Sequence, residues 1–290
     1  MKDLRKICVL GMGLLGSSVS MSILRSMPCV KVVGYSHRRS TRQKAKRLEV
    51  ASEIASSLAE AVSGADMVIL ATPVQTFERI FGQITPLLKP GAIVTDVGST
   101  KSLVHRWASK NLPRSVCFVG SHPIAGSEQR GVEFARDDLL SGARCILTRT
   151  ASTSVSALKT VAGFWTGLGC RVEVMTPARH DRILGLVSHL PHITAASLVN
   201  ANSIDDAKYA GKGFMDASRI ASGPENVWVD ILLTNRGNCD KGISRLIREL
   251  KKLQAALRTG NQKKIEELLH KARTKRQELI RYKIGKRELF

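Results

Sequence analysis

One histidine, His122, stands in the segment best suited to acid–base chemistry, residues 120–128 (GSHPIAGSE). The segment follows a short apolar run that we predict to be a strand, so the imidazole should lie at a strand end. Ligands of open parallel sheets bind beyond such strand ends, and histidine is the side chain whose ordinary pKa lies near neutral pH. Position alone makes His122 a candidate general base, with a structural histidine as an equal alternative.

A glycine-rich turn, residues 11–17 (GMGLLGS), follows the first predicted strand and opens a helix. In a GxGxxG turn the first glycine permits the tight turn, the second lets the backbone approach a pyrophosphate, and the third allows close helix packing. The helix N-terminus adds free N–H groups and the positive end of its dipole. The turn therefore predicts a dinucleotide site whose contacts include Gly11, Gly13, Leu14, Leu15 and Gly16.

The loop after the second predicted strand, residues 34–41 (GYSHRRST), should choose between the two nicotinamide cofactors. An NAD enzyme usually places an acid there for the ribose hydroxyls, and this loop contains none. Ser36 occupies the expected position, and His37, Arg38 and Arg39 follow where a 2′-phosphate needs cationic donors. We expect NADP in preference to NAD, with two ordinary surface arginines as the alternative.

Two more loops follow predicted strands, at residues 71–73 (ATP) and 96–101 (DVGSTK). Because ligands bind beyond the carboxyl ends of parallel strands, both loops should face the nicotinamide half of the cofactor. They add Thr72, Pro73 and Ser99 to the predicted cofactor contacts. Lys101 has the charge to meet an anionic group, but we expect it on the surface.

The elements that must position these residues follow from hydrophobic patterning. Over the first 175 residues short apolar runs, rich in Val and Ile, alternate with longer amphipathic stretches, as in a parallel sheet covered by helices on both faces. After Thr176-Pro177 helical periodicity dominates to the end of the chain. We predict an α/β fold with a Rossmann doubly wound parallel sheet over residues 1–175 and a helical domain over residues 176–290. Strands are expected at residues 6–10, 30–35, 67–71, 92–96, 117–121, 144–148 and 171–174.

Composition narrows the classes of protein. The 45 Lys and Arg against 24 Asp and Glu give a charge of +21. Such a charge is consistent with binding of a nucleic acid, with attraction of an anionic substrate and its cofactor, or with a basic surface that only contacts solvent. Aromatic residues make up 4%, too few for a base-stacking surface, so a nucleic-acid partner is not expected. The six cysteines form no CxxC pair, which argues against zinc and disulfides. No run of about eighteen apolar residues suggests a membrane span, and we expect a cytoplasmic protein.

Several segments in the same order resemble the prephenate and arogenate dehydrogenase family. They are GMGLLGSS, DVGSTK, GSHPIAGSE, His180-Asp181-Arg182 followed by VSHLPH, and FMDASRIA, which together span roughly residues 6–235. The resemblance implies that a hydride passes from C4 of a cyclohexadienol ring to NAD(P)⁺ while the ring carboxylate leaves as carbon dioxide. Prephenate would give 4-hydroxyphenylpyruvate, and arogenate would give tyrosine.

The same resemblance implies roles for individual residues. His122 would hydrogen-bond the 4-hydroxyl as general base, and Ser99 would orient His122 or contact the same hydroxyl. Arg219 would pair with a substrate carboxylate, a task suited to a planar fork of donors. Ser127 and Glu128 would make polar contacts near the substrate entrance.

Residues 181–192 can also be judged by spacing. Asp181 and Ser188 are seven apart and Ser188 and His192 four apart, so one helical face can present all three to the substrate. His189 lies beside that face, where a buried structural role and a substrate contact are both possible; His192 is the better candidate for contact. Pro191 predicts a kinked or interrupted helix. The two histidines have no evident third ligand, so we expect no metal site.

Two alternative functions compete with a homodimeric NAD(P)-dependent dehydrogenase that acts on prephenate or arogenate. Another two-domain Rossmann dehydrogenase, of the 3-hydroxyacid or 6-phosphogluconate type, would use a lysine of the helical domain and lack the HPIAGSE loop. A nucleic-acid-binding protein would use the basic residues 241–290, which hold 16 Lys and Arg against 5 Glu. The homodimer is implied by the resemblance and by the amphipathic stretches at residues 243–257 and 263–281.

Overall fold

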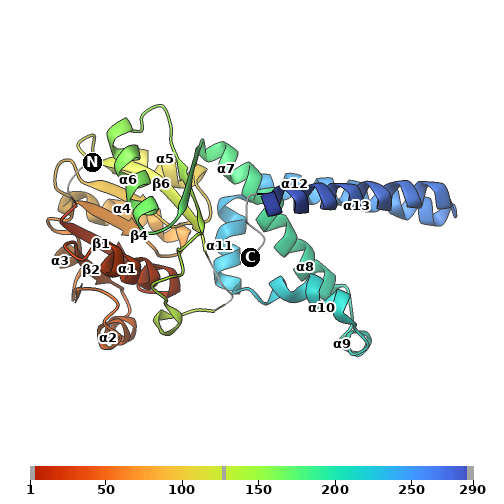
Figure 1. Ribbon diagram of the computed structural model, residues 1–290, viewed down its shortest axis with the longest axis horizontal. Coiled ribbons are helices and arrows are strands. Elements are labelled where there is room, and N and C mark those ends of the chain that lie inside the picture. The colour runs from red at the N-terminus through yellow and green to blue at the C-terminus, as the bar shows by residue number, and fades with distance from the viewer. Residues whose placement is uncertain (1–3, 126–128, 286–290) are drawn as a thin grey trace. The chain divides into compact units, whose positions relative to one another are not determined.

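The fold is built on an eight-stranded sheet with strand order β3-β2-β1-β4-β5-β6-β7-β8 (Figure 1). It is described by a computed structural model that covers residues 4–125 and 129–285. The strands are β1 (Lys6–Leu10), β2 (Lys31–Tyr35), β3 (Glu53–Ile54), β4 (Met67–Leu70), β5 (Ile93–Asp96), β6 (Cys117–Ile124), β7 (Arg144–Thr148) and β8 (Arg171–Met175).

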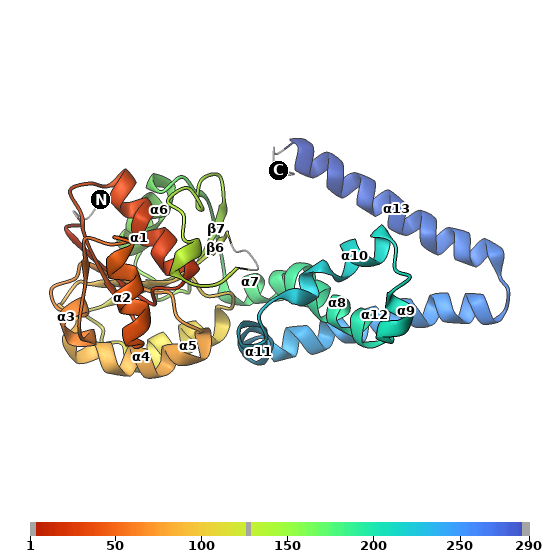
Figure 2. The ribbon, with the colours of Figure 1, turned by 90° about the horizontal axis from the view of Figure 1, so that it is seen from below.

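Helices cover both faces of this sheet, which confirms the predicted doubly wound α/β fold. They are α1 (Leu14–Ser26), α2 (Arg39–Arg47), α3 (Leu58–Val62), α4 (Phe77–Ile84), α5 (Ser102–Asn111) and α6 (Val155–Gly167). α1 and α6 lie on one face of the sheet, and α4 and α5 lie on the other (Figure 2). Val19, Phe164 and Trp165 are buried on the first face, and Phe77 and Phe81 are buried on the second. Burial on both faces explains why the strand sequences do not alternate between apolar and polar residues.

One pairing corrects the expectation of a wholly parallel sheet. β7 runs antiparallel to β6, with His122 opposite Ile146. Parallel neighbours need a long crossover connection, usually a helix. Among the residues described between these two strands, the helical structure is only the 3-10 turn η3 (Val132–Phe134). The chain therefore returns beside β6 in the opposite direction, and β8 becomes parallel to β7 after the crossover through α6.

Helices alone follow β8 in the described chain, as predicted. They are α7 (Pro177–Leu184), α8 (Leu190–Asn200), α9 (Ile204–Ala207), α10 (Lys212–Ser218), the 3-10 turn η5 (Arg219–Ser222), α11 (Glu225–Thr234), α12 (Arg236–Arg258) and α13 (Gln262–Gly285). A π-helical segment, Gly185–His189, joins α7 to α8, whose second residue is Pro191. The interruption predicted from Pro191 is confirmed, since a wider turn suits a residue that has no N–H to donate.

The stretch Pro177–Asn200 is long and apolar enough to cross a membrane, by length and composition alone. It nevertheless contains the polar side chains of His180, Asp181 and His189, which are buried and hydrogen-bonded to other parts of the chain. Such contacts indicate that the apolar side chains of this stretch serve packing within the protein.

The chain divides into two compact units, one ending at Cys239 and one beginning at Asp240. The first unit contains the sheet, the helices through α11 and the first turn of α12. The second unit contains the rest of α12 and the whole of α13, which are joined by a turn at Gly260 with φ of +58°. The catalytic candidates all belong to the first unit.

Candidate active site

A cavity of about 700 Å³ opens where β1, β2 and β4 end. Its size falls within the range of small-molecule and cofactor sites. The predicted cofactor contacts that line it are Gly11, Gly13, Ser36, His37, Arg38, Thr72 and Pro73. The other predicted contacts, which lie outside this lining within the described chain, are Leu14, Leu15, Gly16, Arg39 and Ser99.

The glycine turn is crowded on the protein side and open toward the cavity. Gly11 has φ of +109°, and a Cβ on it would lie 2.4 Å from the carbonyl oxygen of Ala71. A Cβ on Gly16 would lie 1.8 Å from the carbonyl oxygen of Gly11. Around Gly13, by contrast, a Cβ would meet nothing within 4 Å among the described atoms. This arrangement fits a pyrophosphate resting on the backbone at the start of α1.

Cationic side chains also line the cavity. Arg38 is joined there by Lys44 from α2 and Arg79 from α4, two residues that the sequence analysis did not single out. Arg42 fixes the loop after β2, because its guanidinium donates to the carbonyl oxygens of Ser36 (2.6 Å) and His37 (3.1 Å). An acid in the cavity wall, Glu133, pairs with Lys44 at 3.4 Å.

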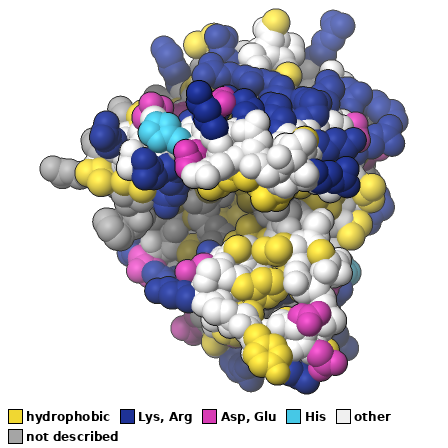
Figure 3. Space-filling model, turned by 90° about the vertical axis from the view of Figure 1, so that its right-hand side faces the viewer, with side chains coloured by type: hydrophobic (Ala, Val, Ile, Leu, Met, Phe, Trp, Pro, Cys, Tyr) yellow, Lys and Arg dark blue, Asp and Glu magenta, His cyan; other side chains and the backbone are white. Residues whose placement is uncertain are grey.

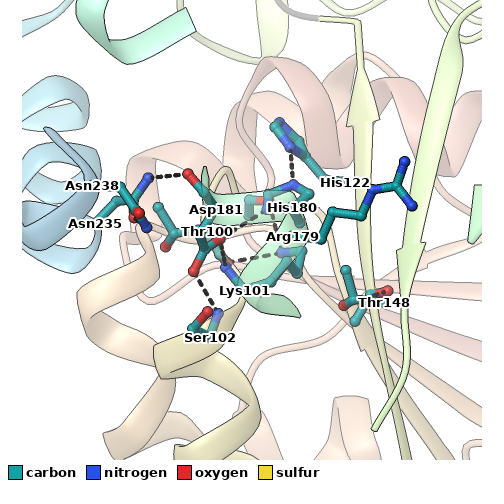
Figure 4. A network of polar contacts seen from close by, with 12 residues as sticks. Thr100, Lys101, Ser102, His122, Thr148, Arg179, His180, Asp181, Asn235 and Asn238 are labelled. Atoms are coloured by element: carbon teal, nitrogen blue, oxygen red, sulfur yellow. Dashed lines mark hydrogen bonds and ion pairs between the residues drawn. The ribbon is translucent and has the colours of Figure 1, made fainter. Parts of the chain in front are cut away.

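His122 is held by a second histidine. Its Nδ1 lies 2.9 Å from Nε2 of His180, and Nδ1 of His180 lies 2.8 Å from a carboxylate oxygen of Asp181 (Figure 4). His122 comes from β6 and is half-buried, whereas His180 and Asp181 are neighbours on α7 and are buried. We call this row of three side chains the histidine relay.

Asp181 ends the relay with both carboxylate oxygens occupied. They accept the backbone N–H groups of Lys101 and Ser102, each at 2.8 Å, at the start of α5. Burial would raise the pKa of Asp181, but hydrogen bonds from His180 and Ser102 outweigh it and lower that pKa. Asp181 thus lies behind His180, whereas its spacing in the sequence predicted a position facing the substrate.

A buried ion pair lies beside the relay and overturns the expectation that Lys101 is a surface residue. Lys101 is fully buried; its ammonium contacts the buried carboxylate of Asp96 and donates to the carbonyl oxygen of Gly98 at 2.7 Å. Asp96 also accepts the backbone N–H of Ser121 at 3.0 Å. These contacts hold the loop after β5 in place next to His122.

The surroundings keep the imidazole of His122 neutral. Burial lowers the pKa of His122 well below its ordinary value, and the positive charge that His180 can carry and the charge of Lys101 act in the same direction. Ser99, the predicted orienting residue, is half-buried and makes no hydrogen bond to His122 among the described contacts. The partner that orients His122 in the structure is His180.

The remaining predicted contacts fall into different environments. His189 is buried and its Nδ1 lies 3.1 Å from the side-chain amide of Asn235, which suits a structural role. His192 stacks on Trp228, with ring centroids 3.5 Å apart, and its buried Nδ1 has no hydrogen-bond partner among the described atoms. Ser188 is half-buried, and Arg219 is exposed at the start of η5. Ser127 and Glu128 lie outside the described residues.

His180 is the main contact that sequence reasoning missed. It lies 58 residues from His122 along the chain, so no local spacing links the two. The available signal was the His-Asp pair at residues 180–181, because a histidine beside a carboxylate can be fixed in one orientation.

Two family models match the chain. The model of the nucleotide-binding domain of prephenate dehydrogenase matches residues 19–174, and that of the dimerization domain of prephenate dehydrogenase matches residues 176–271.

Individual relatives resemble the chain over most of its length. Cyclohexadienyl dehydrogenase of Zymomonas mobilis is 32% identical over 87% of this chain and 88% of its own. Prephenate dehydrogenase from A. aeolicus, solved in complex with hydroxyphenyl propionate and NAD⁺, is 34% identical with a TM-score of 0.89 over 96% of this chain and 99% of its own. Arogenate dehydrogenase of Synechocystis is 28% identical, with a TM-score of 0.82 over 95% of this chain and 100% of its own.

Proposed function

The chain belongs to the prephenate dehydrogenase family, and we propose that it oxidatively decarboxylates prephenate or arogenate in tyrosine biosynthesis. The observation that carries this proposal is a neutral histidine, His122, fixed at the carboxyl edge of a sheet whose glycine turn fits a dinucleotide. The nicotinamide cofactor, when bound, accepts the hydride from C4 of the ring.

His122 has a defined task in this reaction. Its imidazole accepts a hydrogen bond from the 4-hydroxyl and draws the proton toward itself while the hydride leaves C4. The electron pair released with carbon dioxide completes the aromatic ring, so the proton then returns to the phenol oxygen. A positioned base contributes about 10²–10⁴-fold to such a step.

Other residues would hold the substrate. Arg219 would pair with a carboxylate, and Ser188 and His192 would contact the ring or side chain from the helical region. Ser127 and Glu128 would line the entrance. We assign cofactor binding to residues 1–175 and substrate binding and dimerisation to residues 176–290.

The function is tested with the purified chain, prephenate and arogenate, and both cofactors. His122→Asn should lower kcat by about 10²–10⁴-fold while the dissociation constant of the cofactor, measured by fluorescence titration, stays within about threefold. His105→Gln is the matched control, because His105 is also a largely buried histidine but bonds to Thr148 rather than to the relay. Near-normal turnover of His122→Asn, or a wild-type protein that oxidises neither substrate, would overturn the proposal.

We also propose that NADP is preferred to NAD. Ser36 stands where an acid would bind the ribose, and Arg38, Lys44 and Arg79 supply cationic donors for a 2′-phosphate. Arg38→Ala should lower kcat/KM for NADP by about tenfold or more and leave that for NAD nearly unchanged. Arg39→Ala is the control, since the neighbouring Arg39 lies outside the described cavity lining. Equal or better efficiency with NAD in the wild-type protein would contradict this preference.

We propose a cytoplasmic homodimer, with prephenate or arogenate as the small-molecule partner. The matched dimerization domain supports the dimer. Figure 3 shows hydrophobic side chains exposed at the surface, as well as many Lys and Arg side chains. Large apolar side chains more than half exposed in the helical region are Val187, Ile204, Tyr209, Met215, Val229, Leu233, Leu250, Leu257, Leu269, Leu279, Tyr282 and Ile284.

A further inference from the structure

We propose that His180 and Asp181 are positioning residues that fix the tautomer of His122, so that its Nε2 is held as the proton acceptor. The proposal rests on the function above, in which His122 is the base. In this proposal the two buried residues of α7 neither contact the substrate nor serve only for packing.

The tautomer follows from the donors and acceptors in the relay. An ionised carboxylate only accepts hydrogen bonds, so Nδ1 of His180 must donate to Asp181 at 2.8 Å. A neutral imidazole carries one N–H, which leaves Nε2 of His180 as an acceptor. Nδ1 of His122, 2.9 Å away, must then be the donor. The single proton of neutral His122 is thus on Nδ1, and Nε2 keeps its lone pair.

The ionised state of Asp181 is secured independently of the histidines. Its oxygens also accept the backbone N–H groups of Lys101 and Ser102 at 2.8 Å each, at the N-terminus of the ten-residue helix α5. Free N–H groups and the positive end of a helix dipole both favour a negative charge. The contacts that cap α5 therefore keep Asp181 ionised and fixed in position. Its carboxylate in turn determines which nitrogen of each histidine donates and which accepts.

The neutral state of His180 is the second requirement. A cationic His180 would donate from Nε2 and force Nδ1 of His122 to accept, which would reverse the tautomer. Burial lowers the pKa of His180, the hydrogen bond that His180 donates to Asp181 opposes this effect, and the positive charge of Lys101 adds to it. The other titratable groups around the relay include Asp96 at the end of β5, His105 from α5, His189 from the π-helical segment, and the thiols of Cys145 from β7 and Cys239 from α12.

The relay also acts while the proton is shared with the substrate. When Nε2 of His122 takes the proton, the imidazole becomes cationic, and its Nδ1–H continues to donate to His180. The hydrogen bond from His180 to Asp181 places a negative charge at the far end of the row, which stabilises that cation. The proton then returns to the product oxygen and leaves every member of the relay in its starting form.

Nitrogen NMR tests the tautomer directly. In wild-type enzyme labelled with ¹⁵N-histidine, the signals of His122, identified by their absence in His122→Asn, should show a protonated Nδ1 and an unprotonated Nε2 near neutral pH. Asp181→Asn and His180→Leu should each change this pattern, whereas His105→Gln should preserve it. A protonated Nε2 in the wild-type protein would overturn the proposal. This measurement needs no substrate, so it remains decisive even if the proposed reaction fails.

Kinetics separate positioning from a merely structural role. His180→Gln keeps an oxygen that can accept from His122 but breaks the link to Asp181. It should lower kcat by about tenfold or more and move the acid limb of the pH profile to lower pH, because the carboxylate no longer supports the cation. The KM of the cofactor should stay within about threefold. A loss of thermal stability with an unmoved acid limb would show that the two residues only support the fold, and would overturn the proposal.

Discussion

His122 can accept a proton only while its imidazole is neutral, and its neighbours decide over which pH range this holds. Burial is the largest influence, and it lowers the pKa of His122 well below the ordinary value because the cation loses its hydration. The charge of Lys101 adds to the same effect. The acceptor form is therefore the dominant one at neutral pH.

The pH dependence of catalysis should follow from this shift. A lowered histidine pKa keeps the acceptor form further into acid, so kcat/KM should stay level from about pH 8 to about pH 6 and fall only below that range. The measurement is kcat/KM for prephenate or arogenate at saturating cofactor. The residual rate of His122→Asn should lack this acid limb. A midpoint at or above the ordinary histidine value of about 6.5 would contradict the lowered pKa.

Single residues show where sequence reasoning ends. His122 could be predicted because a strand and a polar loop mark the sheet edge within nine residues, 120–128. Its partner His180 could not, because the contact joins residues 58 apart. We expect Lys101 to be exposed because lysine is almost never buried alone, yet Asp96, five residues earlier at the end of β5, neutralises it.

At the scale of elements, the loop between β5 and α5 depends on its buried ion pair. Lys101→Met should lower the free energy of unfolding by about 3–5 kcal/mol, because it leaves the carboxylate of Asp96 buried without its cation. Urea titration followed by circular dichroism would measure the change. The control is Lys110→Met, which removes an exposed lysine paired with Glu78 at 2.8 Å and should have no resolvable effect. Equal effects of the two substitutions would contradict the importance of burial.

Two alanine substitutions in the glycine turn between β1 and α1 distinguish its role in folding from its role in cofactor binding. Gly16→Ala places a Cβ 1.8 Å from the carbonyl oxygen of Gly11, so the turn must shift and both the melting temperature and cofactor affinity should fall. Gly13→Ala meets no described atom within 4 Å, so the melting temperature should hold while the Cβ blocks the approach of the pyrophosphate. Calorimetry without and with NADP tests both. A stable Gly16→Ala that binds cofactor normally would refute this account of the turn.

Strands could be predicted where burial requires a run of several apolar residues in the sequence. The strands β1 and β7 have the expected bounds, and the other five expected strands differ by one to three residues at an end. β3 escaped prediction because two residues, Glu53 and Ile54, carry no periodicity. The direction of β7 was not predicted, because the sequence of a strand does not show which way its neighbour runs. The pairing follows from the connection after β6, whose described residues form no helix longer than the 3-10 turn η3.

At the scale of the whole molecule, high charge and exposed apolar surface act against each other. Each chain carries +21, so two copies repel at long range. Leu250 and Leu257, seven residues apart on α12, are 57% and 60% exposed and offer apolar area on one helical face. Burial of apolar area between two chains favours their association by roughly 25 cal/mol per Å². This gain opposes the electrostatic repulsion between the two chains.

A dimer of twice 31.6 kDa is therefore expected by sedimentation velocity at moderate salt. Leu250→Asp with Leu257→Asp should shift the equilibrium toward the monomer, because it adds four charges to a dimer interface that contains this face. Val155→Asp is the matched control, since Val155 is 65% exposed but lies on α6 of the nucleotide-binding region. A wild-type monomer at micromolar concentration would contradict the dimer.

The salt dependence of this dimer distinguishes it from binding to a polyanion. Salt screens repulsion between like charges over a Debye length of about 8 Å at physiological ionic strength, so the dimer should strengthen as salt rises from low to moderate concentration. Binding of the basic residues 241–290 to nucleic acid would show the opposite dependence, because counterion release makes that affinity fall with salt. Sedimentation across a salt series, repeated with duplex DNA, measures both. A dimer that weakens with added salt would mean that unlike charges, rather than apolar faces, join the two chains.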